Sequence, residues 1–159
     1  METTMDEPIQ LQTHIGLSKA RGMISGLMDK VVAGSLRVIS RRKDAMALVP
    51  VEAMGQLLAQ AYPFHPEAYF DGESGVALWL PELAVGAEGE NLEDAQDALV
   101  SAVLDYVTTW EEELRRAPNH AARFGWVYRV ELAERPDRIR RMLFADSEAS
   151  DIRRAPSFL

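Results

Sequence analysis

The stretch LSKARGMISGLMDKVVAGSLRVISRRKDAMALVPVEAMGQLL, residues 17–58, decides the fold of the first part of the chain. Over residues 17–33, apolar side chains recur every three or four positions, a spacing that predicts an amphipathic helix. This apolar stripe consists of Leu17, Ala20, Ile24, Leu27 and Val31. Gly34 is expected to end the helix, because glycine readily adopts the left-handed conformation that closes a helix.

Two short apolar runs follow this helix and predict a β-hairpin. They are LRVIS (residues 36–40) and AMALV (residues 45–49), with the polar sequence RRKD between them. Pro50 then suits the first turn of another helix, which we expect to continue to Ala61. Ahead of the first helix, IQLQ (residues 9–12) is expected to form a leading strand.

Charge is distributed unevenly along the chain, whose formal net charge is -8. Residues 1–61 hold seven basic and six acidic residues, whereas the remainder holds ten basic and nineteen acidic residues. Such asymmetry suggests two modules with different partners. The sequence AYPFHP (residues 61–66), with its two prolines, is expected to be a linker. We therefore predict domains at residues 1–61 and 67–145, followed by a flexible tail over residues 146–159.

The second domain is expected to contain a small sheet and two helices. Three strands are predicted, at residues 68–70, 76–80 and 84–88. The alternation in WVYRVEL (residues 126–132) predicts a fourth. Asn91 is expected to cap a long helix, and Pro136 to begin the last one. The predicted fold class is α+β: an α/β dimerisation domain followed by a small three- or four-stranded α+β domain.

The sequence offers little for catalysis. It has no cysteine, and its three histidines lack the close spacing of metal-ligand motifs. Neither a phosphate-binding glycine loop nor a GxSxG nucleophile elbow occurs. We therefore expect no metal, no cofactor and no catalytic residue. Trp79, Trp110 and Trp126 are expected in the core, because no basic residues interleave with them as a base-stacking platform would require.

The chain is expected to be a cytoplasmic protein without a membrane partner. Its first residues, METTMDEPIQLQT, are acidic and polar, unlike a secretory signal. No run approaches the roughly 18 apolar residues of a membrane span. The lack of cysteine gives no sign of an oxidising compartment.

The order of features in residues 17–58 resembles the N-terminal domain of Phd/YefM-type antitoxins. The shared features are an Ala-Arg helix start, a leucine-rich stripe, a glycine-bounded turn, a V-x-I strand, a basic turn, and an apolar strand that ends at a proline. Here they fall at Ala20-Arg21, Ile24 to Leu27, Ala33-Gly34, Val38-Ile39, Arg41-Arg42-Lys43 and Ala47-Leu48-Val49-Pro50. The family's turn usually has glycine after the basic pair, where this chain has Lys43-Asp44.

The resemblance implies a homodimer that binds operator DNA and represses transcription of its own operon. The residues it assigns to DNA binding are basic side chains of the first helix and the hairpin: Lys19, Arg21, Arg37, Arg41, Arg42 and Lys43. A dimer doubles the phosphate contacts, and counterion release makes such binding salt dependent. Charge alone would not distinguish DNA from RNA or from an acidic protein.

In this family, the part that follows the N-terminal domain binds and neutralises a cognate toxin, commonly an mRNA-cleaving RelE/ParE-like protein or a Doc-like one. Residues 68–107 also resemble the core of HicB-type antitoxins, and residues 118–144 resemble the C-terminal part of antitoxins paired with RelE-like toxins. The last helix is expected either to be an ordinary amphipathic surface helix or to lie in a toxin groove. Its toxin-binding candidates are Arg138, Ile139, Arg141, Met142, Leu143 and Phe144.

Two other functions remain open. The overall acidity and the missing turn glycine suggest an interaction or adaptor protein that keeps the antitoxin fold without binding DNA. An enzyme with an acidic pocket in the second domain is the third possibility. Residues 67–113 contain thirteen acidic and no basic residues, so this span is either a solvated face or a docking surface for a basic protein.

Overall fold

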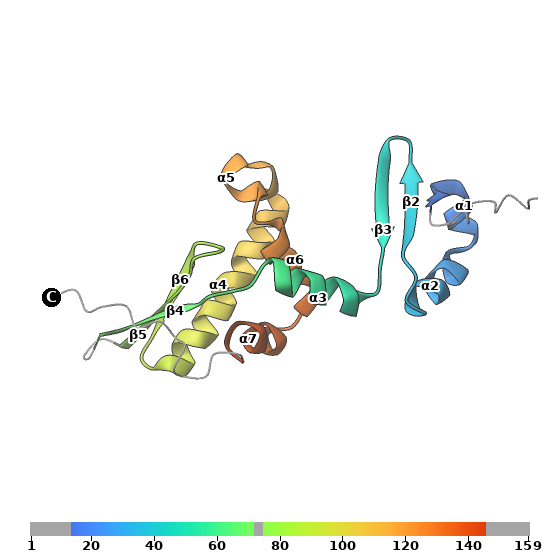
Figure 1. Cartoon of the computed structure of the whole chain (residues 1–159). Coiled ribbons are helices and arrows are strands. Elements are labelled where there is room, and N and C mark those ends of the chain that lie inside the picture. The colour runs from blue at the N-terminus through green and yellow to red at the C-terminus, as the bar shows by residue number, and fades with distance from the viewer. Residues whose placement is uncertain (1–13, 72–74, 146–159) are drawn as a thin grey trace, which may run out of the picture. The chain divides into compact units, whose positions relative to one another are not determined.

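The structure is a computed structural model that describes residues 14–71 and 75–145 (Figure 1). The chain forms two compact units, Met1–Met54 and Gly55–Leu159. Each unit contains one three-stranded sheet together with helices, so the predicted α+β class is confirmed. The units divide within α3 (Val51–Ala61), a short way before the predicted end of the first domain.

The first unit is built on a mixed sheet with the strand order β1-β2-β3. β1 (His14–Gly16) runs parallel to β2 (Arg37–Arg41), and β3 (Asp44–Leu48) runs antiparallel to β2. The pairing of β2 with β3 confirms the predicted hairpin. The leading strand expected at residues 9–12 lies outside the described residues.

The helix predicted over residues 17–33 is two helices, α1 (Leu17–Gly22) and α2 (Ile24–Val32). Met23 separates them, because its φ of -136° lies outside the helical range. Gly22, directly before the break, has a low helix propensity, which reduces the cost of interrupting the helix there. The prediction of one continuous helix is therefore wrong at Met23, although both pieces are helical.

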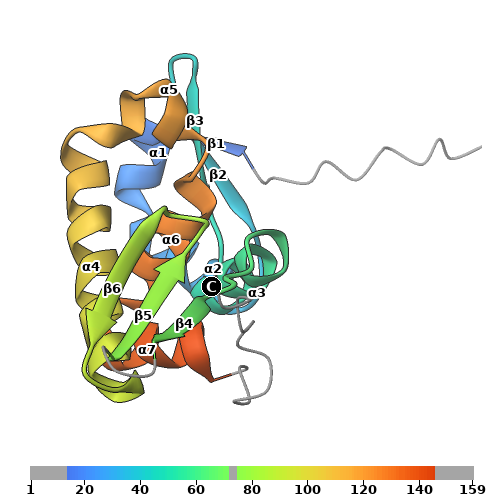
Figure 2. The ribbon, with the colours of Figure 1, turned by 90° about the vertical axis from the view of Figure 1, so that its left-hand side faces the viewer.

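The second unit has an antiparallel sheet, one face of which is covered by a long helix (Figure 2). The strands pair in the order β4 (Glu67–Asp71), β5 (Gly75–Leu80) and β6 (Val85–Gly89). α4 (Leu92–Glu112) packs against β5 and β6. The predicted cap is confirmed, because the side chain of Asn91 accepts a 3.0 Å hydrogen bond from the backbone N–H of Asp94.

After α4, the described part of the second unit is helical. Its segments are η1 (Leu114–Arg116), α5 (Pro118–Ala121), α6 (Phe124–Ala133) and α7 (Pro136–Phe144). WVYRVEL lies in α6, so the prediction of a fourth strand is wrong. Val127 and Val130 are both buried, and their spacing of three also fits one face of a helix. The last helix does begin at Pro136, as predicted.

The two units differ greatly in the size of their hydrophobic cores. Among the described residues, the core cluster of the first unit contains only Ala20, Leu27 and Ile39. The core of the second unit contains fifteen buried apolar residues, drawn from β4, β5, α4, α6, α7 and the turn after β5. A larger buried apolar area stabilises the folded state more, so the second unit is the better able to fold without help.

The three tryptophans do not share one environment. Trp110 is buried and Trp126 packs partly buried against the core, which agrees with their predicted place. Trp79 is 38% exposed, so its predicted core position is wrong. It lies on β5 between the buried Leu78 and Leu80, and the alternation of side chains along a strand turns it to the opposite face of the sheet.

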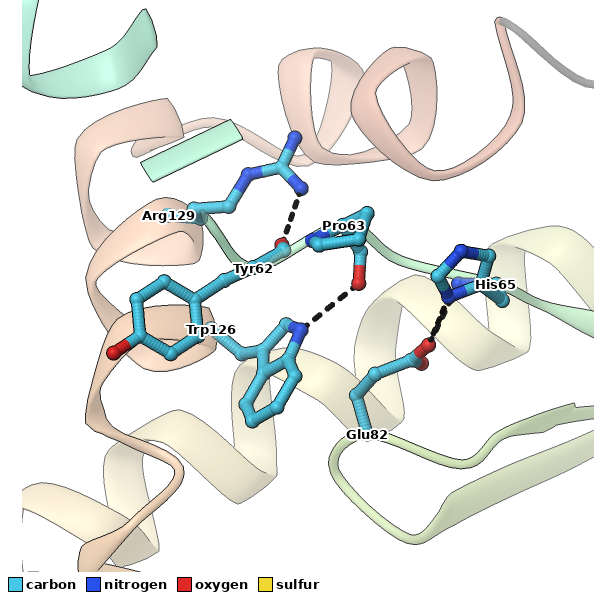
Figure 3. A network of polar contacts seen from close by, with 6 residues as sticks. All are labelled: Tyr62, Pro63, His65, Glu82, Trp126 and Arg129. Atoms are coloured by element: carbon cyan, nitrogen blue, oxygen red, sulfur yellow. Dashed lines mark hydrogen bonds and ion pairs between the residues drawn. The ribbon is translucent and has the colours of Figure 1, made fainter. Parts of the chain in front are cut away.

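The segment predicted to be a linker, residues 61–66, packs against α6 (Figure 3). Trp126 Nε1 donates a 2.9 Å hydrogen bond to the carbonyl of Pro63, and Arg129 donates one of 2.7 Å to the carbonyl of Tyr62. The rings of Tyr62 and Trp126 meet edge to face, with centroids 5.1 Å apart. These contacts fix the segment to the second unit.

A further contact ties the same segment to the turn between β5 and β6 (Figure 3). Glu82 Oε1 accepts a 2.9 Å hydrogen bond from the backbone N–H of His65 and lies 2.8 Å from His65 Nδ1. The side chain of Glu82 is only 9% exposed, whereas that of His65 is 69% exposed. The segment is therefore held at both of its ends.

Gly125→Ala should loosen this attachment. A Cβ added at Gly125 would lie 2.3 Å from ring atoms of Tyr62, so the ring or α6 would have to move. We expect the free energy of unfolding of the second unit to fall by about 1–3 kcal/mol in urea denaturation followed by tryptophan fluorescence.

Gly55→Ala is the matched control, because no heavy atom lies within 4 Å of a Cβ added there. Alanine in place of glycine within α3 should leave stability unchanged or raise it by up to about 1 kcal/mol. A Gly125→Ala protein as stable as the wild type would contradict the close packing of Tyr62.

Candidate nucleic-acid and protein interfaces

The hairpin tip presents three consecutive basic residues around a two-residue turn. Arg41 and Asp44 form the last pair of the β2–β3 ladder, and Arg42 and Lys43 lie between them. All four are exposed. Arg42 has a φ of 55°, a left-handed conformation that costs a residue with a Cβ about 1–2 kcal/mol. The turn is thus formed without glycine, at a local cost in stability.

The start of α1 lies at the same end of the sheet as the hairpin tip. β1 is parallel to β2 and places Gly16 beside Ser40, one residue before Arg41, and α1 begins directly after Gly16. The exposed Lys19 and Arg21 therefore lie on a helix that starts near the tip.

Arg37 is the member of the predicted DNA-binding set that lies apart from the tip. It pairs with Leu48 at the opposite end of β2 and is only partly exposed. Its guanidinium donates a 2.7 Å hydrogen bond to the carbonyl of Leu36. The structure thus places Arg41, Arg42 and Lys43 at one end of the sheet and Arg37 at the other, while Lys19 and Arg21 lie on the helix that begins near the tip.

The described part of the first unit carries an excess of positive charge. Residues 14–54 contain seven basic and three acidic residues. Within the described ranges, no ion pair joins a basic residue of this unit to a carboxylate. Unpaired cations on a projecting tip create a positive potential that attracts polyanions.

α2 exposes a second apolar stripe beside its buried one. Leu27 is 1% exposed, but Ile24, Met28 and Val32 are 48%, 58% and 83% exposed. These three residues follow one another at intervals of four, so they share one face of the helix. Met23, Leu36, Met46 and Val51 add further exposed apolar area in this unit. Clustered apolar side chains of this kind are typical of protein contact surfaces.

α7 divides the predicted toxin-binding residues between core and surface. Ile139 and Leu143 are 0% and 3% exposed and belong to the core of the second unit. Met142 and Phe144 pack partly buried against it. Arg138 and Arg141 are exposed. A toxin that contacts the folded unit at α7 would therefore meet these two arginines.

Further contacts hold α7 against α4. Arg140 forms an ion pair with Asp97 and donates a 2.8 Å hydrogen bond to Gln96 Oε1. Arg141 pairs with Asp137 one helical turn earlier, at 3.2 Å. Arg140 thus fixes the helix on the unit, while Arg141 makes only a local pair.

A polar cluster that the sequence did not reveal joins α4, α5 and the turn after β5. Tyr106 Oη lies 2.9 Å from His120 Nδ1, and Arg123 lies within hydrogen-bonding distance of Tyr106 and donates a 2.8 Å bond to the carbonyl of Leu83. Trp110 Nε1 donates to the carbonyl of His120 at 3.2 Å. These polar groups bind one another and main-chain carbonyls, which is a structural role.

Two carboxyl groups, Glu111 of α4 and Glu131 of α6, interact in the second unit. Burial, a hydrogen bond with Glu111 and the charge of Glu111 raise the pKa of Glu131 to about 7. Because the pKa is higher in the folded than in the unfolded chain, the folded protein binds the extra proton. The contribution of Glu131 to stability should therefore be fully present below about pH 4.5 and be lost as the pH rises through about 7.

Comparison with known proteins identifies the class of protein that carries these surfaces. Residues 11–145 match the PHD-like family described as "Antitoxin of toxin-antitoxin, RelE / RelB, TA system". The match spans most of the chain, which therefore belongs to this family of antitoxins. No curated protein matches.

A solved structure has a similar fold. It is the crystal structure of an antitoxin part of a proposed toxin/antitoxin system from Syntrophomonas wolfei subsp. wolfei. The superposition has a TM-score of 0.70 and covers 82% of this chain and 96% of that chain, at 18% sequence identity. This likeness supports the fold.

Among the helices in the described ranges, none is long and apolar enough to cross a membrane.

Glu131→Gln should remove the pH dependence caused by the carboxyl pair. Glutamine stays neutral, so the variant should melt about 3 °C above the wild type at pH 8 and at a similar temperature at pH 4.5. The effect is small because Glu131 is only partly buried, so solvent screens part of its charge. Thermal denaturation followed by circular dichroism measures it, with the exposed Glu112→Gln as control. A difference in melting temperature that is the same at both pH values would contradict the raised pKa of Glu131.

Proposed function

We propose that this chain is a Phd/YefM-type antitoxin of a type II module. Its first unit would bind operator DNA as part of a homodimer and repress the operon, while its second unit would bind and neutralise a cognate toxin. The observation that carries the proposal is the exposed, unpaired basic tip of the first unit in a chain that belongs to an antitoxin family.

The geometry of the tip suits a phosphate backbone. Arg41, Arg42 and Lys43 project at the end of a two-stranded hairpin, and a projecting hairpin of this width fits a groove of duplex DNA. Lys19 and Arg21 extend the positive region along α1. Phosphate contacts of this kind supply affinity and position the protein without reading the sequence.

Lys43→Ala should weaken operator binding in a salt-dependent manner. The measured quantity is the slope of the logarithm of the binding constant against the logarithm of the salt concentration. Each phosphate contact that is lost should make this slope less steep by about 1, and each copy in the dimer loses one contact. Fluorescence anisotropy with duplex DNA from the chain's own upstream region measures this slope. Lys30→Ala is the matched control, because Lys30 is equally exposed but lies on α2, outside the predicted set. Equal slopes for the two variants would rule out the proposed role of the tip.

A second copy of the chain supplies what the first unit lacks. Among its described residues, the unit buries a core cluster of only three, yet it exposes the stripe Ile24, Met28 and Val32. A small domain with so little buried apolar surface is marginally stable and commonly gains stability by oligomerisation. Burying the stripe against its counterpart would complete the core and place two basic tips on one DNA duplex.

Met28→Glu should disrupt this dimer, because a carboxylate would be buried in an apolar contact. The full chain should then elute with the mass of a monomer in light scattering, and operator affinity should fall at least tenfold, by about 1.4 kcal/mol or more. Lys30→Glu places the same side chain on the opposite side of α2 and should leave the mass unchanged. A dimeric Met28→Glu protein would exclude this stripe as the contact.

The second unit is the proposed toxin-binding part. Its large core gives a stable scaffold, and Arg138 and Arg141 on α7 are available to a partner. The family description names RelE and RelB, which supports a RelE/ParE-like mRNA interferase as the toxin. An antitoxin of this kind acts by binding, so we expect no catalysis of its own and a place in the cytoplasm beside its toxin.

A further inference from the structure

The sheet of the second unit has an outer face that α4 does not cover (Figure 2). The inward side chains of β5, Val76, Leu78 and Leu80, are buried, whereas Trp79 is 38% exposed. Tyr69 on β4 is 42% exposed. The outer face of this sheet is thus aromatic rather than uniformly polar.

Small residues between the two rings leave a shallow pocket on this face. Tyr69 pairs with Ala77, and Trp79 pairs with Gly86. A Cβ at Gly86 would lie 3.0 Å from Cε3 of Trp79, so the indole lies close over this glycine. Tyr69, Ala77, Trp79, Gly86 and Glu88 are among the residues that line the pocket.

Carboxylates flank the aromatic rings. Glu67 pairs with Trp79 across β4 and β5, and Glu88 pairs with Ala77 across β5 and β6. The phenol of Tyr69 donates a 2.8 Å hydrogen bond to Glu67, which raises the pKa of Tyr69. No lysine or arginine occurs between Lys43 and Arg115, so none of the three strands carries a positive charge.

Trp79 differs from the other tryptophans in its polar contacts. Trp110 and Trp126 each donate an indole hydrogen bond to a main-chain carbonyl, at 3.2 and 2.9 Å. Within the described residues, the indole of Trp79 has no such partner. An exposed tryptophan beside a tyrosine, with the carboxylates of Glu67 and Glu88 nearby, is the type of surface on which guanidinium and ammonium groups stack.

We propose that this outer face is a docking surface for an arginine- or lysine-bearing segment of a basic partner protein. A cationic side chain would lie over Trp79, between Glu67 and Glu88, with its aliphatic stem above Ala77 and Gly86. The negative charge of the face repels nucleic acid and anionic lipid, whereas it attracts a cationic polypeptide. This surface is separate from α7, and the inference does not depend on which protein the toxin is.

The three indole N–H signals of the full-length protein provide the test. In two-dimensional NMR with 15N-labelled tryptophan, the Trp79 signal is assigned by its loss in Trp79→Phe. The probe is a blocked eight-residue peptide of alternating arginine and glycine. We expect it to shift the Trp79 signal saturably, with a dissociation constant of about 0.1–1 mM. The signals of Trp110 and Trp126 should stay in place, and added salt should weaken the binding.

Paired variants test the role of charge. Glu67→Gln combined with Glu88→Gln should weaken peptide binding about threefold to tenfold. The control combines Glu93→Gln with Asp105→Asn, which removes two exposed carboxylates from α4 instead. It should leave binding within about twofold of the wild type, because these two carboxylates lie on α4 and not on the strands that line the pocket.

Four outcomes would overturn the proposal. The first is no shift of Trp79 with the arginine peptide, and the second is an equal shift with a matched aspartate-glycine peptide. If dilution of the protein alone shifts the Trp79 signal, a second copy of the chain covers this face. If Arg153→Ala with Arg154→Ala shifts it without peptide, the chain's own C-terminal segment is the occupant.

Discussion

The packing of α4 on the sheet of the second unit is the interaction on which the rest of the structure depends. Leu78 and Leu80 from β5 belong to one core cluster with Leu99 and Val103 from α4, and α6 and α7 add Val127 and Ile139 to it. This unit therefore has enough buried apolar surface to form a rigid scaffold. Over residues 14–54, the first unit has no element comparable to α4, and its core cluster holds three residues.

The difference between the cores has a functional consequence. In the proposed homodimer, the exposed apolar stripe of the first unit would be buried against a second copy, and pairing would double whatever its other surface binds. In the first unit that other surface is the basic tip, held on a turn in which Arg42 adopts a left-handed conformation. Backbone strain of this size is tolerated where the side chain is needed for function, and such strain clusters at functional sites. The second unit, self-sufficient and acidic, is suited to a different partner.

Much of the secondary structure could be predicted from the sequence, because local signals agree with the fold. The hairpin, the Asn91 cap and the helix at Pro136 follow from strand patterns, capping chemistry and the position of proline. WVYRVEL was wrongly predicted as a strand because its side chains alternate, whereas its two buried valines, three residues apart, fit one face of a helix and not one face of a strand. Only packing against α4 and residues 62–64 shows which of its residues are buried.

The candidate sites were predictable in part. The sequence predicted that Arg41, Arg42 and Lys43 lie at the turn of a hairpin, and in the structure they do. Ile139 and Leu143, by contrast, are apolar at helical spacing whether a helix packs on its own core or on a partner, so sequence could not tell that they are buried. The exposure of Trp79 is equally hidden, because it depends on which face of the sheet α4 covers.

The central claim is that operator binding and toxin neutralisation reside in different units. The most direct test co-expresses the full chain with the product of its neighbouring reading frame and measures growth, together with a reporter driven by the chain's own upstream DNA. The variant with Arg41, Arg42 and Lys43 all changed to alanine should restore growth as the wild type does but fail to repress the reporter. Loss of both activities, or repression equal to the wild type, would contradict the separation of the two roles.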